Sequence, residues 1–482
     1  MSNHEWQVGI LINNQEALAQ SYAEIRDPGK LTDLVGRVAV GNAEDVDKAV
    51  QAAHKAFLAW RKTDVKERIE KINAAVKVVQ DSMGDLVPLL VREHGGVVWE
   101  AQTDFGFGMG LLQYYAGIGE SFLKAELIED ASSWSCIEKK AKGVVVGIIP
   151  WNMPVCLTMS KLVPALVTGN TLVIKPSPTA PLALSILLKR IAALLPDGVI
   201  NVVHGDADVG MALTVHPLVK KIGFTGGTVT GAQVSTNAAP FFKTVTLELG
   251  GNDAAVILDD VNPADIMPAL LKGVYTRSGQ ICFAVKRIYV QEKMVDKFFN
   301  TMCEFVNEYK VGHGLDERAS FGPVNNKNQY NKVKSFIENS KNSGATVREL
   351  GSKLDPSGWD NGYFILPHVV KDAANSSQIV NCEQFGPIIP IISYKTVEQA
   401  IAYANDSEYG LCSSVWSSDV QRALPIAQQI EAGQTFINTH SFDSFGLGLP
   451  FGGVKRSGIG REFAGESTLS AYIDYHVVRY LK

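Results

Sequence analysis

Three side chains in this sequence have the chemistry for acyl transfer through a sulfur atom: Asn152, Glu248 and Cys282. A thiol can attack a carbonyl carbon, and a carboxylate can accept a proton. A side-chain amide can donate a hydrogen bond to the oxyanion that develops. These three groups are the minimum set for chemistry that passes through a thioester, so we expect the fold to bring them together.

The cysteine is distinguished from the others by its neighbours. An isolated cysteine is most often a small buried hydrophobe. Cys282, however, lies between two apolar neighbours, and Gly279 comes three residues before it. This glycine allows a tight turn that would expose the sulfur. The remaining cysteines lack this setting and are interpreted as ordinary buried residues: Cys136, Cys156, Cys303, Cys382 and Cys412.

The carboxylate and the amide, when each is considered alone, could instead have an ordinary structural role. Glu248 ends an apolar stretch and precedes two glycines. It is either a base whose pKa is raised in a partly apolar cleft or a solvated carboxylate at a strand end. Asn152 lies between Pro150 and Pro154, so it is either an amide held for an oxyanion or an ordinary turn residue.

A glycine-rich segment, Phe224-Thr225-Gly226-Gly227-Thr228-Val229-Thr230-Gly231, follows one predicted strand and opens a helix. Glycines at that point let the backbone approach a pyrophosphate at the helix N-terminus. The spacing departs from Gly-x-Gly-x-x-Gly, so the segment alone is a weak signal. Lys175, at the end of the neighbouring strand, either reaches a ribose hydroxyl or a phosphate or is a solvated lysine.

Composition excludes several classes of protein. The chain has 482 residues, 46% hydrophobic and 20% charged, with a net charge of −5. These values predict a globular protein of two or three domains and disfavour nucleic acid as a partner. No apolar run is long enough to span a membrane, and the N-terminus, Met1 to Trp6, lacks the pattern of a secretory signal.

The six cysteines are scattered and include no Cys-x-x-Cys pair. This spacing disfavours a disulfide framework and a zinc site, so we expect no metal. A reducing compartment suits free thiols, and we expect a cytoplasmic protein.

The hydrophobic pattern predicts an α/β protein with a doubly wound, Rossmann-like sheet and a second α/β unit after Glu248. Continuous apolar runs predict buried strands at 143–149, 171–174, 199–203, 221–224, 254–258 and 288–290. Helical spacing predicts helices within 43–94 and at 105–118, 157–167, 182–195, 264–275, 294–308, 327–342 and 397–405. Alternation at 120–142 predicts an exposed hairpin, and 471–478 a late strand.

Taken together, the motifs resemble the aldehyde dehydrogenase superfamily over nearly the whole chain, in the family's order and at its intervals. They are Pro150-Trp151-Asn152-Met153-Pro154, Ile174-Lys175-Pro176-Ser177, Phe224-Thr225-Gly226-Gly227-Thr228, Glu248-Leu249-Gly250-Gly251, Gly279-Gln280-Ile281-Cys282, Glu383-Gln384-Phe385-Gly386-Pro387 and Pro450-Phe451-Gly452-Gly453-Val454-Lys455.

The resemblance implies NAD(P)-dependent oxidation of an aldehyde to the acid. Cys282 would be the nucleophile, Glu248 the base that activates water, and Asn152 with the Cys282 N–H the oxyanion hole. The cofactor would be NAD, bound by Trp151, Lys175, Gly226, Gly227, Thr228, Gly231, Gln329, Glu383 and Phe385. It also implies a dinucleotide-binding domain (1–118 and 142–250), a catalytic domain (251–464) and oligomerisation strands (119–141 and 465–482), hence a homodimer or homotetramer.

Two positions depart from the family's pattern. Many NAD-preferring relatives carry a glutamate three residues after the lysine, where this chain has Pro178. Loss of that carboxylate removes its repulsion toward a 2′-phosphate, so we expect NAD use with incomplete discrimination against NADP. The family often has Lys or Arg after the double glycine, where this chain has Asn252; we have no account of that change.

Positions matched to the family predict an apolar substrate channel without Arg or Lys, and hence a neutral aliphatic or aromatic aldehyde. The channel residues are Met153, Leu157, Ser160, Ile281, Phe283, Phe445 and Phe451. His440 lies near this region; it either contacts a polar substituent or, as we favour, is a loop histidine in solvent.

Three other activities are weighed against aldehyde oxidation. A non-catalytic relative would have lost Cys282, Glu248 or Asn152, and all three are present. A cofactor-independent thiol hydrolase would leave Lys175 and the glycine-rich segment without a purpose. A CoA-acylating enzyme would not need a water-activating base such as Glu248.

Overall fold

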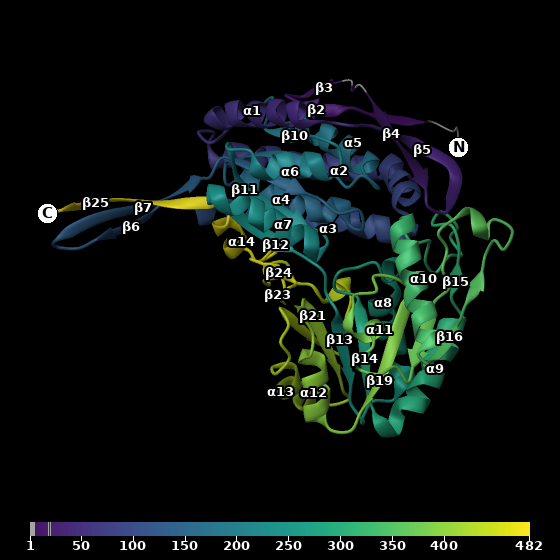
Figure 1. The fold of residues 1–482 in the computed structure, drawn as a ribbon. Coiled ribbons are helices and arrows are strands. Elements are labelled where there is room, and N and C mark those ends of the chain that lie inside the picture. Colours follow the sequence, from purple (N-terminus) through teal and green to yellow (C-terminus); the bar gives the residue numbers. More distant parts are fainter. Residues whose placement is uncertain (1–4, 18, 20) are drawn as a thin grey trace.

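The computed structural model describes residues 5–17, 19 and 21–482 of the chain. Two lobes, each built on its own sheet, lie one above the other, and a narrow arm projects from the side of the upper one (Figure 1). Residues 1–4, on which the expectation of no secretory signal partly rests, lie outside the described residues. No described helix is long and apolar enough to cross a bilayer.

The first lobe is organised around a mostly parallel sheet whose central strands run in the order β12-β11-β8-β9-β10. Antiparallel strands extend both edges. In sheet order the strands are β24 (Gly458–Ile459), β12 (Thr244–Glu248), β11 (Val219–Thr225), β8 (Val144–Ile148), β9 (Thr171–Lys175), β10 (Ile200–Val202), β2 (Ile10–Ile12) and β3 (Gln15–Ala17).

Both faces of this sheet are covered, which explains its continuous apolar runs. Val144 and Val146 pack into one core with α1, α6 and α7, whereas Val145 packs into a second core with α2 to α5. The helices are α1 (Ala43–Trp60), α2 (Val65–His94), α3 (Val98–Leu123), α4 (Pro154–Val167), α5 (Leu182–Ala192), α6 (Ala207–Val215) and α7 (Thr228–Ala238).

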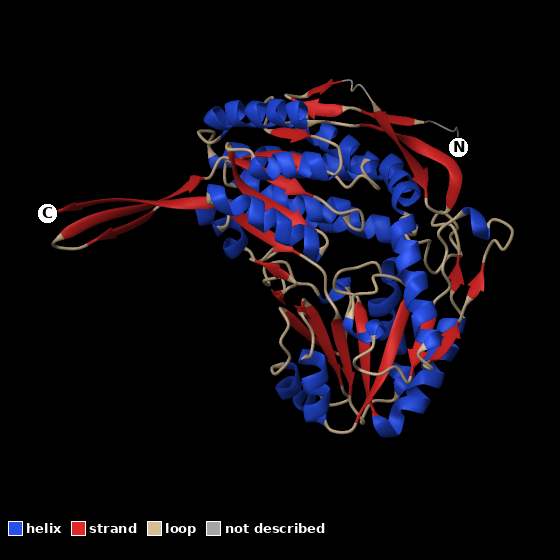
Figure 2. Ribbon diagram, in the orientation of Figure 1, coloured by secondary structure: helices blue, strands red, loops and turns tan. Residues whose placement is uncertain are grey.

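The second lobe repeats the plan with a sheet in the order β16-β18-β19-β14-β13-β21-β22, parallel except at the β16 edge. Its strands are β16 (Thr346–Glu349), β18 (His368–Lys371), β19 (Ile388–Tyr394), β14 (Val285–Gln291), β13 (Asp253–Ile257), β21 (Cys412–Trp416) and β22 (Gln434–Ile437). Helices cover both faces of this sheet as well (Figure 2).

One face of the second sheet packs against α8 (Pro263–Tyr275) and α9 (Val295–Asn307). The other packs against α10 (Lys327–Asn342), α11 (Gln378–Asn381), α12 (Val397–Asn405) and α13 (Val420–Ala427). The remaining strands are β1 (Trp6–Val8), β4 (Tyr22–Asp27), β5 (Lys30–Ala39), β15 (Lys310–Val311), β17 (Ser352–Lys353), β20 (Tyr409–Gly410) and β23 (Val454–Lys455).

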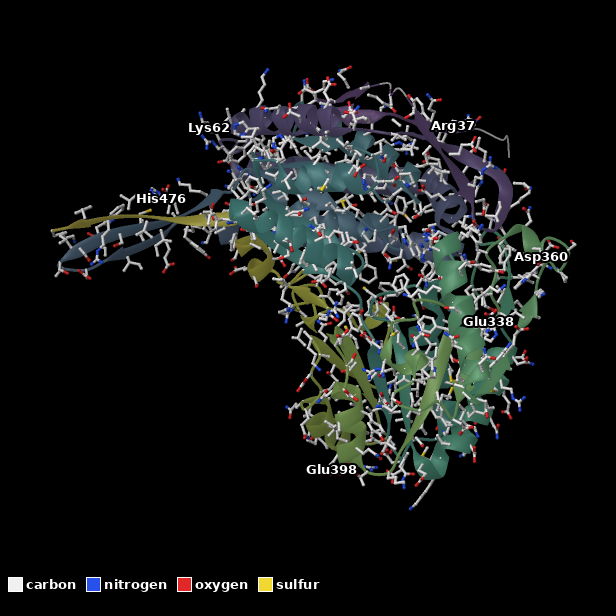
Figure 3. The ribbon with its side chains drawn as sticks, viewed as in Figure 1. Arg37, Lys62, Glu338, Asp360, Glu398 and His476 are labelled. Atoms are coloured by element: carbon white, nitrogen blue, oxygen red, sulfur yellow. The ribbon has the colours of Figure 1, made fainter. Side chains whose placement is uncertain are left out.

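The arm consists of β6 (Glu126–Glu129), β7 (Ser133–Ala141) and β25 (Ile473–Leu481), with α14 (Glu466–Ser470) at its base. β7 pairs with β25 along its whole length, from Ala141 opposite Ile473 to Ser133 opposite Leu481. Side chains of the arm, including His476, stand away from the body of the molecule (Figure 3). The predicted hairpin is too long at its start, because α3 continues to Leu123.

Candidate active site

Cys282 follows a backbone turn made by three consecutive residues with left-handed φ angles. Arg277, Ser278 and Gly279 are consecutive residues with φ of 62°, 57° and 72°. A Cβ at position 279 would lie 2.6 Å from the carbonyl oxygen of Gly386, so glycine is required there for space as well as for φ. The turn ends α8 and leaves the Cys282 side chain partly exposed ahead of β14.

Two cavities meet at Cys282. The first, which we call the polar cavity because the polar and charged side chains of Gln329, Lys332 and Glu383 contribute to an otherwise mixed lining, is lined by Pro150, Trp151, Asn152, Thr225, Gly226, Gly227, Leu249, Gly250, Cys282, Gln329, Lys332, Glu383 and Phe385. The second is apolar and is lined by Phe107, Asn152, Met153, Cys156, Leu157, Ile281, Cys282, Phe283, Phe442, Phe445, Gly446, Leu447, Leu449, Phe451 and Phe463. Asn152 and Cys282 border both, so a molecule in either cavity reaches the thiol.

The side-chain amide of Asn152 is oriented at both of its atoms. Its Oδ1 accepts the N–H of Met153 at 3.1 Å, and its Nδ2 donates to the carbonyl of Gln280 at 3.0 Å. One amide hydrogen is therefore left for a third partner at the junction of the cavities.

Asp104 of α3 holds the start of α4, the helix that follows Asn152. Its carboxyl accepts hydrogen bonds from the N–H groups of Val155 and Cys156, and burial raises its pKa to about 7.

The thiol of Cys282 is protonated at rest. Burial raises its pKa to about 12, the Lys286 ammonium opposes this shift, and the nearby carboxylates of Glu248, Asp253 and Glu383 add to it. Lys286 donates to the Cys282 carbonyl at 2.6 Å and to the Ile281 carbonyl at 3.0 Å, so it also holds the backbone of the loop. Attack by this sulfur requires a base that removes its proton.

Glu248 has the environment of such a base. It ends β12, is 2% exposed, and neither carboxylate oxygen has a hydrogen-bond partner among the described residues. Burial raises its pKa well above the usual range, and the nearby Glu462 carboxylate adds to the rise. Glu462 is itself paired with Lys161 Nζ at 2.8 Å.

Most of the predicted cofactor residues line the polar cavity: Trp151, Gly226, Gly227, Gln329, Glu383 and Phe385. The rings of Trp151 and Phe385 meet edge to face at 5.7 Å. Glu383 accepts the N–H of Gly251 at 3.0 Å, and Gln329 Nε2 donates to the carbonyl of Phe385 at 2.7 Å. The backbone around this cavity is thus held by side chains from distant segments.

The other three predicted cofactor residues lie outside that cavity. Lys175 ends β9 with Nζ 3.5 Å from the Pro176 carbonyl, and burial lowers its pKa to about 8. Thr228 begins α7. Gly231 faces Leu249, whose Cδ2 would lie 2.3 Å from a Cβ at that position, so this glycine is needed for packing of α7.

The apolar cavity contains six of the seven residues predicted for the substrate channel: Met153, Leu157, Ile281, Phe283, Phe445 and Phe451. Ser160 is the exception. It is fully buried and donates to Glu462 at 2.9 Å, because it lies on the side of α4 that faces the Lys161–Glu462 pair. The expectation that Ser160 borders the channel does not agree with this position.

Sequence reasoning missed three phenylalanines of the apolar cavity: Phe107, Phe442 and Phe463. The Phe283 ring lies 4.8 Å from that of Phe442 and 4.5 Å from that of Phe445. None of the described residues lining the cavity is charged. Helical spacing places Phe107 on α3, but no motif links it to Cys282.

His440 was expected in solvent, and that expectation is wrong. The ring is fully buried, with Nδ1 2.9 Å from Ser414 Oγ and Nε2 2.7 Å from the carbonyl of Phe283. It therefore supports the backbone of Phe283 from behind instead of facing the cavity.

Comparison with known proteins agrees with this arrangement. Residues 15–478 match the model of the family described as the aldehyde dehydrogenase family. The chain is 37% identical to geranial dehydrogenase of Castellaniella defragrans, covering 92% of this chain and 93% of that protein. It is 34% identical to the aldehyde dehydrogenase citD of Monascus ruber, covering 88% of this chain and 84% of that protein.

Solved structures give the same result. A betaine aldehyde dehydrogenase point mutant from Staphylococcus aureus, in complex with NAD+ and with a modified cysteine, superposes with a TM-score of 0.93 at 31% identity, covering 98% of this chain and 97% of that one. An NAD+ complex of aldehyde dehydrogenase from Bacillus cereus gives 0.93 at 30% identity, covering 99% and 97%. The chain belongs to the aldehyde dehydrogenase family.

Proposed function

We propose that this protein oxidises a neutral, apolar aldehyde to the carboxylic acid with NAD, through a thiohemiacetal and a thioester on Cys282. The observation that carries the proposal is the position of Cys282 and Asn152 where the polar and apolar cavities meet. An aldehyde in the apolar cavity would present its carbonyl to the thiol, and a cofactor in the polar cavity would lie beside the same carbon.

The proposed reaction assigns a step to each of three side chains, Asn152, Glu248 and Cys282. Glu248 takes the thiol proton as the sulfur bonds to the carbonyl carbon. The oxyanion that forms accepts hydrogen bonds from the free amide N–H of Asn152 and from the backbone N–H of Cys282. NAD, when bound, supplies the hydride acceptor that turns the thiohemiacetal into a thioester. Glu248 passes the thiol proton to solvent and then takes a proton from water as the water oxygen bonds to the thioester carbon. The carbon–sulfur bond breaks, the acid leaves, and the sulfur recovers a proton from Glu248. Because the ionised form of Glu248 is needed and its pKa is raised, activity increases with pH.

The residues of the polar cavity fit the nicotinamide half of NAD. Glu383 presents carboxylate oxygens suited to ribose hydroxyls, and Phe385 and Trp151 present an aromatic wall suited to the ring. We assign Lys175, Thr228 and Gly231 to the adenosine and pyrophosphate end. Since Pro178 leaves no carboxylate against a 2′-phosphate, NADP is accepted as well, with a lower kcat/KM. A strong preference for NADP would contradict this assignment.

The uncharged phenylalanine-rich cavity supports an apolar substrate. A carboxylate-bearing semialdehyde would need a cationic partner, which the described lining lacks. The test is a substrate panel followed by NADH absorbance, with kcat/KM for benzaldehyde and hexanal expected to exceed that for succinic semialdehyde at least tenfold. The reverse order would refute the proposal.

A trimethylammonium aldehyde is the second candidate, because aromatic faces also attract quaternary ammonium groups. The observation in its favour is the ring cluster of Phe283, Phe442 and Phe445, together with the similarity to betaine aldehyde dehydrogenase. Trp and Tyr make stronger cation–π partners than Phe, and the cavity lining contains neither. Betaine aldehyde therefore belongs in the same panel, where we expect it to rank below hexanal.

We further propose that the arm joins two or four copies of the chain. It exposes a row of apolar side chains: Leu127, Ile128, Tyr475, Val477, Val478, Tyr480 and Leu481. Such a row on exposed strands is characteristic of an interface. Light scattering should give a dimer or tetramer mass for the full chain, and a monomer at micromolar concentration would contradict this.

A further inference from the structure

Arg277 connects the two segments that carry Asn152 and Cys282. It lies five residues before the nucleophile, and its side chain is 2% exposed. Its Nε and Nη2 both donate to the backbone carbonyl of Asn152, at 3.0 and 2.7 Å. A planar guanidinium can direct two N–H groups at one oxygen, and an ammonium cannot reproduce that arrangement.

The connection is reciprocal. The side-chain amide of Asn152 donates to the carbonyl of Gln280, and the Gln280 N–H donates back to the carbonyl of Arg277 at 3.0 Å. The turn before the nucleophile therefore holds both ends of Asn152, its peptide through Arg277 and its side chain through Gln280. Arg277 itself lines neither of the two cavities, so it acts on the site through Asn152.

The environment of the guanidinium is built for it. His94 Nδ1 accepts from Arg277 Nη1 at 2.9 Å and from the N–H of Gly96 at 3.0 Å, so Nδ1 carries no proton. Burial, with a contribution from Arg277, lowers the pKa of His94 well below its usual value and keeps the ring neutral. Glu100, 3.8 Å away and equally buried, supplies the balancing charge and accepts the Arg277 N–H.

Gly96 gives the guanidinium its space. A Cβ at this position would lie 1.7 Å from Arg277 Nη1 and 2.7 Å from Glu100 Oε2, far inside van der Waals contact. The left-handed backbone of Arg277, at φ 62°, is unfavourable for a residue with a side chain. This backbone conformation is stabilised because Gly96 leaves space for the guanidinium and Glu100 balances its charge.

We propose that Arg277 is a positioning residue of the oxyanion hole: it holds the Asn152 peptide so that the free amide hydrogen points at the carbonyl oxygen of the substrate. This inference rests on the proposed role of Asn152. Loss of the guanidinium lets the Asn152 loop relax, and a displacement near 1 Å at such a group lowers turnover by roughly 100-fold.

A double-mutant cycle separates positioning from general structural support. We expect Arg277→Gln to lower kcat for hexanal by about 10- to 100-fold in the wild-type background and by less than about twofold in the Asn152→Ala background, because its effect passes through that amide. The dissociation constant for NAD and the alkylation rate of Cys282 by iodoacetamide should change less than about threefold. Equal losses in both backgrounds would overturn the proposal.

Three further variants guard the cycle. Gly96→Ala displaces the guanidinium without removing its charge and should reproduce the same pattern. Arg277→Lys, which keeps the charge, replaces Arg277→Gln if the latter does not fold, and equal kcat losses in the two backgrounds would again overturn the proposal. Arg68→Gln is the matched control: Arg68 is also a buried arginine bonded to carbonyls, those of Thr63 and Val167, but lies away from the site.

The control should lower thermal stability without changing kcat per folded subunit. A kcat loss in Arg68→Gln equal to that in Arg277→Gln would also overturn the proposal, because any buried arginine would then suffice. Failure of Asn152→Ala to reduce kcat would instead contradict the proposed oxyanion hole, which keeps the two failures distinguishable.

Discussion

The two sides of Cys282 are built in different ways. The polar side is made by backbone turns, such as the Gly226-Gly227 turn and the left-handed Phe385 (φ 53°), and by Glu383 bonded to the N–H of Gly251. The apolar side is made by side chains that separate segments contribute, with Phe107 from α3 and Phe463 from a late loop. Changes on the apolar side should therefore alter substrate preference without disturbing the backbone that we assign to the cofactor.

Asn152 borders both sides, so its loss should have the largest effect among the residues that neither bond covalently to the substrate nor transfer a proton. Asn152→Ala should reduce kcat about 100- to 1000-fold, the usual cost of one oxyanion donor. KM for NAD should change little, since the amide acts on the substrate oxygen. Steady-state kinetics with hexanal measures both, and a tenfold rise in KM for NAD with unchanged kcat would place Asn152 on the cofactor side alone.

A matched pair of phenylalanine substitutions tests whether the two sides are independent. Phe283→Ala removes the ring at the centre of the apolar cluster and should lower kcat/KM for benzaldehyde about 10- to 100-fold, with a smaller effect on acetaldehyde. Phe385→Ala should raise KM for NAD and leave the ratio between the two aldehydes unchanged. If either variant changes both KM for NAD and the ratio of kcat/KM between the two aldehydes, the two sides are not independent.

The smallest expected effect concerns pH and the far end of the cofactor. Burial lowers the pKa of Lys175 to about 8, so the amine is charged below that pH and loses its charge above it. A charged amine donates better to cofactor oxygens, so KM for NAD should rise severalfold between pH 7 and pH 9. Lys175→Gln should have a raised KM for NAD that no longer depends on pH in this range. If KM for NAD in this variant still rose between pH 7 and pH 9, Lys175 would not be the group that contacts the cofactor.

Motifs confined to a few consecutive residues were predictable because the chemistry and the turn lie in the same short segment. The Gly279 turn before Cys282 and the apolar run before Glu248 are of this kind. Four strands of the first sheet, β8, β9, β10 and β11, were also predictable, since strands buried on both faces have continuous apolar runs, as Val144 to Val146 show.

The second sheet was predicted only in part. β19 lies between β14 and β18 yet contains Pro390, and proline is unusual in an interior strand. β21 contains Ser413 and Ser414, whose polarity hides a fully buried strand; Ser414 is satisfied by Trp416 Nε1 at 2.9 Å and by His440. Such strands are recognisable only once their partners are known.

Side chains that act across long sequence separations were not predictable for the same reason. The burial of His440 depends on Ser414 and Phe283, and the contact of Ser160 depends on Glu462, 302 residues later. Arg277 likewise depends on His94 and Glu100 from the other lobe. None of these pairs leaves a pattern in the local sequence.

Trapping the acyl-enzyme tests the central claim most directly. Glu248→Gln removes the base that activates water but keeps its shape, so the thioester should persist. Because this variant also lacks the base that takes the thiol proton, acylation should be slow and should accelerate with pH. Mixed with hexanal and NAD, it should release no more than one NADH per subunit, and mass spectrometry should then find one hexanoyl group on the peptide containing Cys282. Full turnover by Glu248→Gln, or an acyl group on any other cysteine, would contradict the account.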